Sequence, residues 1–412
     1  MAQDKAVYLK LTSQSASIAN YWKYYIGQTE QLKRLHVIEK KQREESAFNT
    51  WAKENNTDVD LMQKFDKIYE GYAPLAKQSV YYTECFRASA LARLGANLEP
   101  LAKYLAKNEY NKDSIKRYVT PLKTGYRDLM KGVDVATDKE MFAEMTKMYR
   151  DSIPEEQLPD IYKNVIFKKF GNVNDIKTYN AYTASVFDNT FLLDSVKFKT
   201  FVDSPAMAII NNDPAIQYSI SFVKNYEKNN QPKVEAFSNE KKMLSRTYVH
   251  DLMEWKKDKT FSPDANSTMR VTYGSVKSYD PQDGVHYKYF TTLDGLIAKY
   301  KAGDDEFDAP KELLSLYNKK DYGRYADADG SLHTDFITNN DITGGNSGSP
   351  VINGDGELIG AAFDGNWEAM SGDIAFDKKY KRTIVCDVRF ILFLVDKMGH
   401  ADNLIKEMDI RE

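Results

Sequence analysis

The glycines of this chain are unevenly distributed, and this feature constrains its fold more than any other. Of the 21 glycines, six lie at or before position 250 and fifteen lie after it. Glycine is favoured where turns and strand ends need a positive φ, and it destabilises the interior of a helix. The distribution therefore predicts a helical first part and a turn-rich, β-containing last part.

Helical periodicity in the first part supports this division. Five leucines recur at alternating spacings of three and four residues, which places them on one face of a helix. These are Leu91, Leu94, Leu98, Leu101 and Leu105. Pro100 lies within this stripe and lacks a backbone donor, so we expect it to kink or split the helix.

The helical pattern ends at a group of turn-forming residues, Pro263, Asp264 and Asn266. Short β-prone runs separated by glycine, asparagine and aspartate follow them. At 412 residues the chain is also longer than one hydrophobic core usually serves. We therefore predict an α-helical domain over residues 1–262 and a β-containing domain over residues 263–412.

The clearest local prediction in the second domain is a β-hairpin. The sequence Asn353-Gly354-Asp355-Gly356 separates two β-prone runs, Val351-Ile352 and Leu358-Ile359-Gly360. Asparagine and glycine at such positions adopt the left-handed backbone that tight hairpin turns need. We expect the two runs to pair as antiparallel strands.

Composition excludes several classes of function. The 57 Lys and Arg residues nearly balance the 60 Asp and Glu residues, and the net charge is -3. A general nucleic-acid binder needs a basic excess or stripe, which is missing here. Cys85 and Cys386 cannot form a disulfide framework, and the five histidines are scattered along the chain. We therefore expect no metal site and no cofactor.

The sequence also lacks the patterns of membrane and export segments. No apolar run approaches the roughly 18 residues that a membrane helix needs. The first residues contain neither an apolar core nor a small-residue cleavage site, so they do not form a secretory signal. On these features alone, the chain is expected to be cytoplasmic and without a membrane span, although an internal start within a longer secreted protein would give the same pattern.

The strongest chemical signal is the segment Thr343-Gly344-Gly345-Asn346-Ser347-Gly348-Ser349-Pro350. A serine nucleophile needs a sharp turn that exposes its hydroxyl and backbone N–H groups that stabilise an oxyanion. Here Ser347 would be the nucleophile, and the N–H groups of Gly345 and Ser347 would form the oxyanion hole. The alternative is an ordinary glycine-rich hairpin turn without chemistry.

This segment and its surroundings resemble a known family. Gly345 to Pro350 is similar to the Gly-Asp-Ser-Gly-Gly-Pro sequence of chymotrypsin-like proteases. The longer GGNSGSPVINGDGELIGAAFDGNWEAMSGDI, together with Asn20-Tyr21-Trp22-Lys23, resembles the bacterial S46 family of dipeptidyl-peptidases. The resemblance implies an α+β multidomain fold, in which a large α-helical cap domain is followed by the C-terminal half of a chymotrypsin-like double β-barrel.

The same resemblance assigns roles to individual residues. It makes Ser347 the nucleophile and Gly345 an oxyanion-hole residue. Asp364 would hold the free α-amino group of a peptide substrate, and Asn20 would hydrogen-bond the substrate near that end. Gly365 would set the first specificity pocket. An arginine there accompanies acidic preference in the family, so glycine implies a hydrophobic or broad preference.

Simpler explanations exist for two of these residues. Asp364 precedes a glycine and could cap backbone N–H groups in a turn. Asn20 could be an ordinary residue on the surface of a helix. The resemblance further implies peptide substrates with a free N-terminus, a homodimer, and a periplasmic or cell-surface location.

The chain departs from the family in its general base. In the family, the catalytic His and Asp precede the helical domain, in an N-terminal barrel that this chain is expected to lack. His333, 14 residues before Ser347, is the only local stand-in, and it is also expected to be an ordinary strand residue. Without a base the rate should fall by several orders of magnitude, so the isolated chain is expected to be inactive.

Three hypotheses follow from these sequence patterns. The chain is the C-terminal portion of a serine dipeptidyl-peptidase, a non-catalytic peptide-binding protein or pseudoenzyme fragment, or a minimal hydrolase that uses Ser347 with His333. In the first case, the face that should pack against the missing barrel is expected to be apolar and exposed. The apolar run Ile391 to Val395 is one candidate for part of that face, and the alternative is that it packs within the remaining domain.

Overall fold

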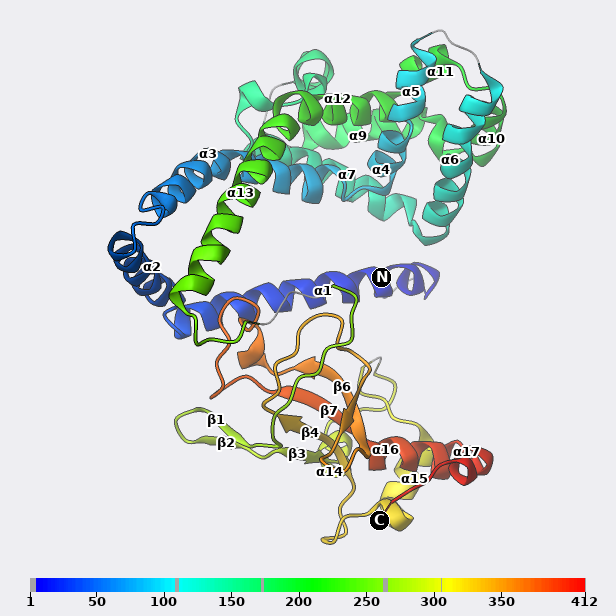
Figure 1. The fold of residues 1–412 in the computed structure, drawn as a ribbon. Helices are drawn as coiled ribbons and strands as arrows, with labels where there is room; N and C mark the ends of the chain where they lie inside the picture. Colours follow the sequence, from blue (N-terminus) through cyan, green and yellow to red (C-terminus); the bar gives the residue numbers. More distant parts are fainter. Residues whose placement is uncertain (1–4, 108–110, 172–173, 262–265, 305, 412) are drawn as a thin grey trace. The chain divides into compact units, whose positions relative to one another are not determined.

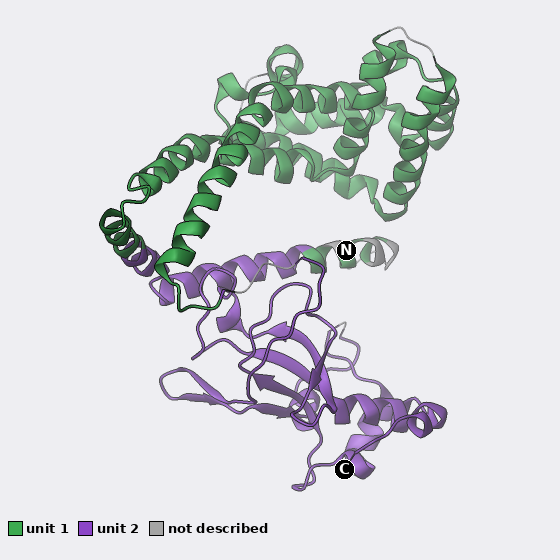
Figure 2. Cartoon of the chain, in the orientation of Figure 1, with its two compact units in different colours: residues 1–17, 45–260 green, residues 18–44, 261–412 purple. Residues whose placement is uncertain are grey.

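The chain folds into two compact units, which are coloured separately in Figure 2. The computed structural model describes residues 5–107, 111–171, 174–261, 266–304 and 306–411. Unit 1 contains residues 1–17 and 45–260, and unit 2 contains residues 18–44 and 261–412. The predicted turn residues Pro263 and Asp264 lie outside the described residues.

Unit 1 is helical, as Figure 1 shows. It contains the first part of α1 (Lys5–Arg34), the last part of α2 (Val37–Glu54), α3 (Leu61–Tyr81), α4 (Ala90–Asn97), α5 (Glu99–Leu105), α6 (Lys112–Gly132), α7 (Val135–Ser152), α8 (Phe167–Phe170), α9 (Ile176–Asn189), α10 (Ser195–Asp203), α11 (Met207–Asn212), α12 (Pro214–Asn229) and α13 (Gln231–Trp255). Short π-helical or 3-10 turns lie between some of these: η1 (Tyr82–Phe86), η2 (Glu155–Gln157), η3 (Tyr162–Ile166) and η4 (Phe191–Leu193).

The predicted leucine stripe forms part of the core of unit 1. All five leucines are buried in one hydrophobic cluster. Pro100 lies in the first turn of α5, where its missing N–H costs no hydrogen bond, and the helix is split there into α4 and α5. The prediction of a split helix is therefore confirmed. Burial of each leucine contributes roughly 1.5–3 kcal/mol to folding.

A buried carboxylate from a neighbouring helix caps the beginning of α4. The Asp138 side chain, on α7, accepts hydrogen bonds from the N–H groups of Ala90 at 2.7 Å and Leu91 at 3.0 Å. It also accepts one from the Ser89 hydroxyl at 3.1 Å. These N–H groups belong to the first turn of α4 and have no partner within the helix, so Asp138 joins the two helices.

Unit 2 contains a mixed set of strands and short helices (Figure 1). The strands are β1 (Tyr279–Gln282), β2 (Val285–Tyr287), β3 (Phe290–Thr292), β4 (His333–Thr338), β5 (Ser349–Ile352), β6 (Leu358–Gly365) and β7 (Thr383–Asp387). The helices and turns are α14 (Leu293–Ile297), α15 (Lys311–Lys319), η5 (Gly323–Tyr325), η6 (Trp367–Ala369), α16 (Val388–Phe393), η7 (Leu394–Met398) and α17 (Asp402–Glu407), with the second part of α1 and the beginning of α2.

The strands form one larger antiparallel sheet and a separate ribbon. The sheet has the order β3-β4-β7-β6-β5, and β1 pairs with β2. The predicted hairpin is confirmed, because β5 and β6 pair across the Asn353–Gly356 turn. Within the described residues, β3 and β5 are the edges of the sheet and are not hydrogen-bonded to each other.

The apolar run near the C-terminus is helical and partly buried. Phe393 is buried in a second hydrophobic cluster, with Leu293, Leu313, Tyr322, Tyr325 and Leu332. Ile391 to Val395 therefore belongs to α16 and η7 and packs within unit 2. Of the two alternatives for this run, packing within the domain is the one that Phe393 follows.

The second part of α1 belongs to unit 2 because it packs closely on the segment after β6. Gly27 is buried there, and a Cβ atom at this position would lie 3.0 Å from the Cγ atom of Met370. The Glu30 carboxylate accepts a hydrogen bond from Trp367 Nε1 at 3.0 Å. The Arg34 guanidinium lies 4.1 Å from the centroid of the Tyr380 ring. Close packing at a glycine thus joins this helix to the sheet unit.

We predict that the Asp138→Ala substitution lowers the stability of unit 1. It leaves the N–H groups of Ala90 and Leu91 buried without an acceptor, which costs about 1–3 kcal/mol. Urea unfolding followed by circular dichroism measures the difference. The matched control is Glu140→Ala on the same helix, where the side chain is exposed and the change should stay within about 0.5 kcal/mol. An equal effect of both substitutions would contradict the capping role.

Candidate active site

The Ser347 loop joins β4 to β5 and contains two glycines that no other residue replaces easily. Gly345 has φ +102° and Gly348 has φ +85°, in the region that L-residues rarely adopt. The Asn346 side chain accepts a hydrogen bond from the Thr343 N–H at 3.2 Å, which stabilises the turn from inside. The loop is therefore a sharp, internally bonded turn that presents the Ser347 side chain at the surface.

The N–H groups of Gly344, Gly345 and Ser347 in this loop make no hydrogen bond among the described residues. The N–H groups of Asn346, Gly348 and Ser349 each donate to a backbone carbonyl. Among the described residues, the N–H groups of Gly345 and Ser347 have no acceptor. These are the two groups that the sequence suggests for an oxyanion hole. Their free donors are a necessary feature of such a hole.

The Ser347 hydroxyl donates to the backbone carbonyl of Phe363 on β6, at 3.2 Å. The N–H of Gly348 donates to the adjacent carbonyl, that of Ala362, at 2.7 Å. The serine turn is therefore attached to β6 at two successive residues. Within the described residues, no histidine is hydrogen-bonded to this hydroxyl.

A β-bulge at Phe363 controls where the next residue points. Ala362 pairs with Val385 on β7, whereas Asp364 pairs with Ile384, so Phe363 is the additional residue. Ala362 and Val385 are both buried on the core face of the sheet. Since directly paired residues share a face and faces alternate along a strand, the bulge turns Asp364 away from the core.

The Asp364 carboxylate is exposed beside the serine turn. Its Oδ1 atom accepts a hydrogen bond from the Gly365 N–H at 2.8 Å, which is the turn-capping role that the sequence also suggested. The other oxygen has no hydrogen bond among the described residues. Asp364 thus combines a local structural contact with one free acceptor, one residue beyond the carbonyl that Ser347 binds.

Gly365 lies at the end of β6, opposite Thr383. A Cβ atom at this position would lie 3.3 Å from the Cβ atom of Ala369 and 3.8 Å from the carbonyl oxygen of Arg382. A side chain is therefore possible only with a small movement of Ala369. The backbone at Gly365 is not in the positive-φ region, so a larger residue would be allowed by the main chain.

Asn20 lies in the second part of α1, on the helix face that packs against other residues of unit 2. Asn20, Tyr24, Gly27 and Gln31 recur at spacings of four, three and four, which places them on one helix face. Gly27 and Gln31 are buried, and the Tyr24 hydroxyl donates to the Asp373 carboxylate at 3.3 Å. Asn20 itself is exposed. None of the hydrogen bonds among the described residues joins it to Ser347 or Asp364.

Two adjacent buried cations support the loops of the site, and sequence reasoning missed both. The Lys381 side chain, in a residue only 3 % exposed, donates to the Asp341 carboxylate at 2.6 Å and to the Ile342 carbonyl at 2.9 Å. Asp341 and Ile342 directly precede the serine turn. Lys381 therefore fixes the beginning of the loop that carries Ser347.

Arg382 performs the corresponding role for the loop after Asp364. It is 2 % exposed and donates to backbone carbonyls, including those of Lys277 and Ser278, each at 3.0 Å. Its own N–H donates to the Asn366 side chain at 2.8 Å, and the Asn366 N–H donates back to its carbonyl at 3.0 Å. Burial lowers the pKa of the Arg382 guanidinium.

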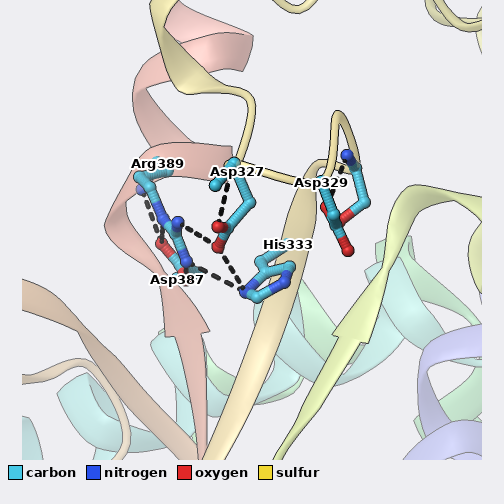
Figure 3. Close-up of polar contacts among 7 residues, drawn as sticks. Asp327, Asp329, His333, Asp387 and Arg389 are labelled. Carbon is cyan, nitrogen blue, oxygen red and sulfur yellow. Dashed lines mark hydrogen bonds and ion pairs between the residues drawn. The ribbon is translucent and has the colours of Figure 1, made fainter.

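His333 belongs to a separate ionic cluster, shown in Figure 3. Its Nδ1 atom lies 3.0 Å from Nη2 of Arg389 and 3.5 Å from the Asp327 carboxylate. A guanidinium can only donate, so Nδ1 accepts and the ring proton lies on Nε2. The ring also stacks on Phe290, with 4.0 Å between centroids. His333 is thus a buried structural residue.

The other bonds of Arg389 hold this cluster together (Figure 3). Its guanidinium donates to Asp387 at 2.8 Å and 3.1 Å and to Asp327 at 2.8 Å. The hydrogen bonds to Asp387 raise the pKa of Arg389, and the Arg389 guanidinium lowers the pKa of Asp327. The cluster joins the end of β7 to the turn before β4.

The sheet register separates His333 from Ser347. Asp364 on β6 pairs with Ile384 on β7, and Ile384 in turn pairs with Ile337 on β4. His333 lies four residues farther along β4, or about 13 Å, and two strand spacings add about 10 Å across the sheet. His333 therefore cannot act as the base for Ser347 in this structure, and the minimal-hydrolase hypothesis is wrong for this arrangement.

The described residues contain neither an evident metal site nor a membrane helix. Within them, no group of three or more His, Cys, Asp and Glu side chains is arranged to hold a metal ion. No helix in the described part of the chain combines the length and apolar character that crossing a membrane requires.

An exposed serine on a glycine-rich turn, beside backbone N–H groups without an acceptor among the described residues, has two of the features that a serine nucleophile needs. Comparison with known families defines the class further. The profile of the family described as Peptidase S46 matches residues 1–410. The chain therefore belongs to the Peptidase S46 family.

Relatives in this family are similar along the whole chain. A protein named dipeptidyl-peptidase 7 from Phocaeicola vulgatus is 37 % identical over 415 residues, which cover 100 % of this chain and 56 % of the relative. Dipeptidyl-peptidase 7 of Porphyromonas gingivalis is 38 % identical, with the same coverages. A protein of Flavobacterium psychrophilum named Asp/Glu-specific dipeptidyl-peptidase is 35 % identical and also matched over 56 % of its length.

A solved structure shows the same fold. The crystal structure of Porphyromonas endodontalis DPP11 in complex with the dipeptide Arg-Glu has a TM-score of 0.85 and 27 % sequence identity. The similarity covers 98 % of this chain and 57 % of that chain. The chain thus spans little more than half the length of the relatives it matches.

We predict that Lys381→Met loosens the serine loop. Without the ammonium, the Asp341 carboxylate and the Ile342 carbonyl lose their shared donor, so amides 343–349 should exchange hydrogen at least tenfold faster, equivalent to about 1.4 kcal/mol. Hydrogen exchange with mass spectrometry measures this. Lys381→Arg should restore part of the protection. Lys378→Met, at an exposed neighbouring lysine, is the control and should change nothing.

Proposed function

We propose that this chain carries the nucleophile and part of the substrate site of a serine-type dipeptidyl-peptidase. One observation carries the proposal: the Ser347 hydroxyl is bonded to the carbonyl of the residue just before Asp364. The bulge turns that carboxylate outward. A dipeptide spans at most about 7 Å, so one substrate could place its α-ammonium on Asp364 and its second carbonyl at Ser347.

In the proposed reaction, Ser347 Oγ attacks the carbonyl carbon of the second residue of the peptide. The N–H groups of Gly345 and Ser347 stabilise the oxyanion. A general base takes the hydroxyl proton and delivers it to the leaving amine as the C–N bond breaks. Water then hydrolyses the acyl-enzyme and releases the dipeptide. Asp364 pairs with the α-ammonium, and Asn20 hydrogen-bonds the substrate near that end.

The general base belongs, in this proposal, to polypeptide outside the chain. His333 is too distant, and the other described histidines have no bond to Ser347. The sheet of unit 2 would then be the C-terminal half of a chymotrypsin-like double β-barrel, with the base in the N-terminal half. The chain alone would be inactive or nearly so. A homodimer and a periplasmic or cell-surface location are part of the same proposal.

We further propose a hydrophobic or broad preference at the first specificity pocket. Glycine at position 365 leaves no charged group to select an acidic side chain, and an apolar pocket discriminates weakly between similar side chains. The relatives include proteins named dipeptidyl-peptidase 7 and proteins named Asp/Glu-specific dipeptidyl-peptidase. Family membership therefore does not decide between the two preferences, and the proposal rests on Gly365.

Non-catalytic peptide binding is the second candidate function. The observation in its favour is that the Ser347 hydroxyl donates to the Phe363 carbonyl, with no base beside it. Asp364 could still bind a peptide ammonium in this state. The two candidates share the ammonium site and differ in whether a completed form of the protein hydrolyses the bound peptide.

Dipeptide binding tests the shared part of both functions. Asp364→Asn should weaken the binding of a free dipeptide such as Ala-Leu at least tenfold, because the ammonium loses its counter-charge. N-acetyl-Ala-Leu should bind both proteins equally weakly. Isothermal titration calorimetry measures the affinities. Asp355→Asn, which removes an exposed carboxylate on the neighbouring hairpin turn, is the control and should bind like the original chain. Ammonium-independent binding would argue against the assignment of Asp364.

A second substitution tests the specificity pocket. Gly365→Arg should favour dipeptides with an acidic second residue, because a guanidinium binds a carboxylate in a bidentate manner. We expect the affinity ratio of Ala-Asp to Ala-Leu to rise at least tenfold, or about 1.4 kcal/mol. Gly354→Arg places the same charge on the hairpin turn, where a Cβ meets nothing within 4 Å, and should leave the ratio unchanged. A shift with both variants would indicate a general charge effect.

A further inference from the structure

An uncovered apolar segment precedes the strands of unit 2. Every residue from Asn266 to Lys277 is exposed. Within this run, Met269 is 94 % exposed, Val271 is 81 % exposed and Tyr273 is 92 % exposed. These three residues occupy alternate positions of a segment that is neither helix nor strand, and alternate positions share one side wherever a backbone is extended. Such exposure of three neighbouring large apolar side chains marks an interaction site.

The backbone of this segment is also unpaired. Among the described residues, no hydrogen bond uses the main-chain N–H or C=O groups of residues 269–273. A segment with unpaired main-chain groups and apolar side chains at alternate positions is a surface to which a strand of another polypeptide can add. Main-chain hydrogen bonds then contribute affinity, and the side chains contribute specificity.

The segment is nevertheless held in place at its far end. The Ser275 N–H donates to the Asn339 side chain at 2.7 Å, and the Asn339 N–H donates to the Ser275 carbonyl at 3.1 Å. A Cβ atom on Gly274 would lie 2.9 Å from the Asn340 nitrogen, so only glycine permits this approach. A partner that docks here therefore meets a positioned surface.

The same contacts place the segment next to the serine loop. The Asp341 N–H donates to the Thr272 hydroxyl at 3.2 Å. The Asp341 carboxylate also pairs with Lys381, at the point where the chain enters the turn that carries Ser347. A polypeptide bound along residues 269–273 would therefore lie beside the loop whose nucleophile has no base.

We infer that Met269, Val271 and Tyr273 form a docking strand for a second polypeptide region, the one that corresponds to the unmatched part of the relatives. The chain covers only 56 % of the Phocaeicola vulgatus relative, so a large region of that protein has no counterpart here. The inference rests on the proposed function, since this region would supply the base for Ser347. The three side chains are the surface on which that region assembles.

The test co-expresses the chain with the part of the Phocaeicola vulgatus dipeptidyl-peptidase 7 that it does not match. We expect a complex on size-exclusion chromatography, and at least tenfold slower hydrogen exchange of residues 266–277 within it. The variant Met269→Ser, Val271→Thr, Tyr273→Ser should lower the recovered complex at least tenfold. Because these side chains are almost fully exposed, the variant should keep the melting temperature of the original chain.

A matched triple variant controls for the loss of apolar surface in general. Ile38→Ser, Val196→Thr and Met243→Ser replace side chains that are 72 %, 72 % and 62 % exposed elsewhere in the chain, and should leave the complex intact. The inference is overturned if no complex forms, or if both triple variants behave alike. It is also overturned if residues 266–277 become protected only through self-association of the chain.

Hydrolysis by the complex is measured separately, so that the two proposals can fail independently. A complex that depends on the three side chains but releases no dipeptide from a peptide substrate supports the docking strand and contradicts the peptidase proposal. In the opposite outcome, the complex hydrolyses peptides, the Ser347→Ala substitution abolishes this activity, and the docking-strand variant still forms the complex. That outcome supports the peptidase proposal and overturns the docking strand.

Discussion

The irregular pairing of β6 with β7 is the constraint on which the candidate site of unit 2 depends. One additional residue, Phe363, interrupts the register between Ala362 and Asp364. Its carbonyl binds the Ser347 hydroxyl, and its presence turns the Asp364 carboxylate from the core face to the surface. A regular strand would leave Asp364 facing buried Thr383, where an unpaired carboxylate is unfavourable. The bulge therefore brings the Ser347 hydroxyl and the Asp364 carboxylate to the same exposed part of unit 2.

Two buried cations, Lys381 and Arg382, stabilise this part of unit 2 from its interior. Lys381 and Arg382 are adjacent in sequence and directly precede β7, yet their side chains bind different segments. Lys381 reaches the residues before the serine turn, and Arg382 reaches the segment before β1 while its backbone binds Asn366. Both cations are desolvated, and their hydrogen bonds offset that cost. The loop that carries Ser347 and the segment that follows Asp364 are thus both held by the two residues directly before β7.

Local sequence patterns predicted the features that depend only on residues close together in the sequence. The glycine distribution separated helical from β-containing sequence, the leucine spacing gave one buried helix face, and the glycines around Ser347 indicated a sharp turn. The bulge at Phe363 could not be predicted, because it depends on the register against β7, which lies some twenty residues later. Lys381 and Arg382 resemble solvated charges in a sequence of lysines. The packing of the second part of α1 within unit 2 has only Gly27 as a local signal, which is too little to identify a contact between segments distant in sequence.

The hydrogen bonds of Arg382 to main-chain carbonyls determine how this part of unit 2 responds to a change in pH. The guanidinium is bonded to main-chain carbonyls, which carry no titratable proton, and arginine itself stays charged throughout the range in which carboxylates and α-amino groups titrate. The contacts that Arg382 makes behind Asp364 are therefore insensitive to acidity. Under the proposed function, a change in acidity would therefore act through the charge of the peptide amine, and the contacts of Arg382 would stay the same.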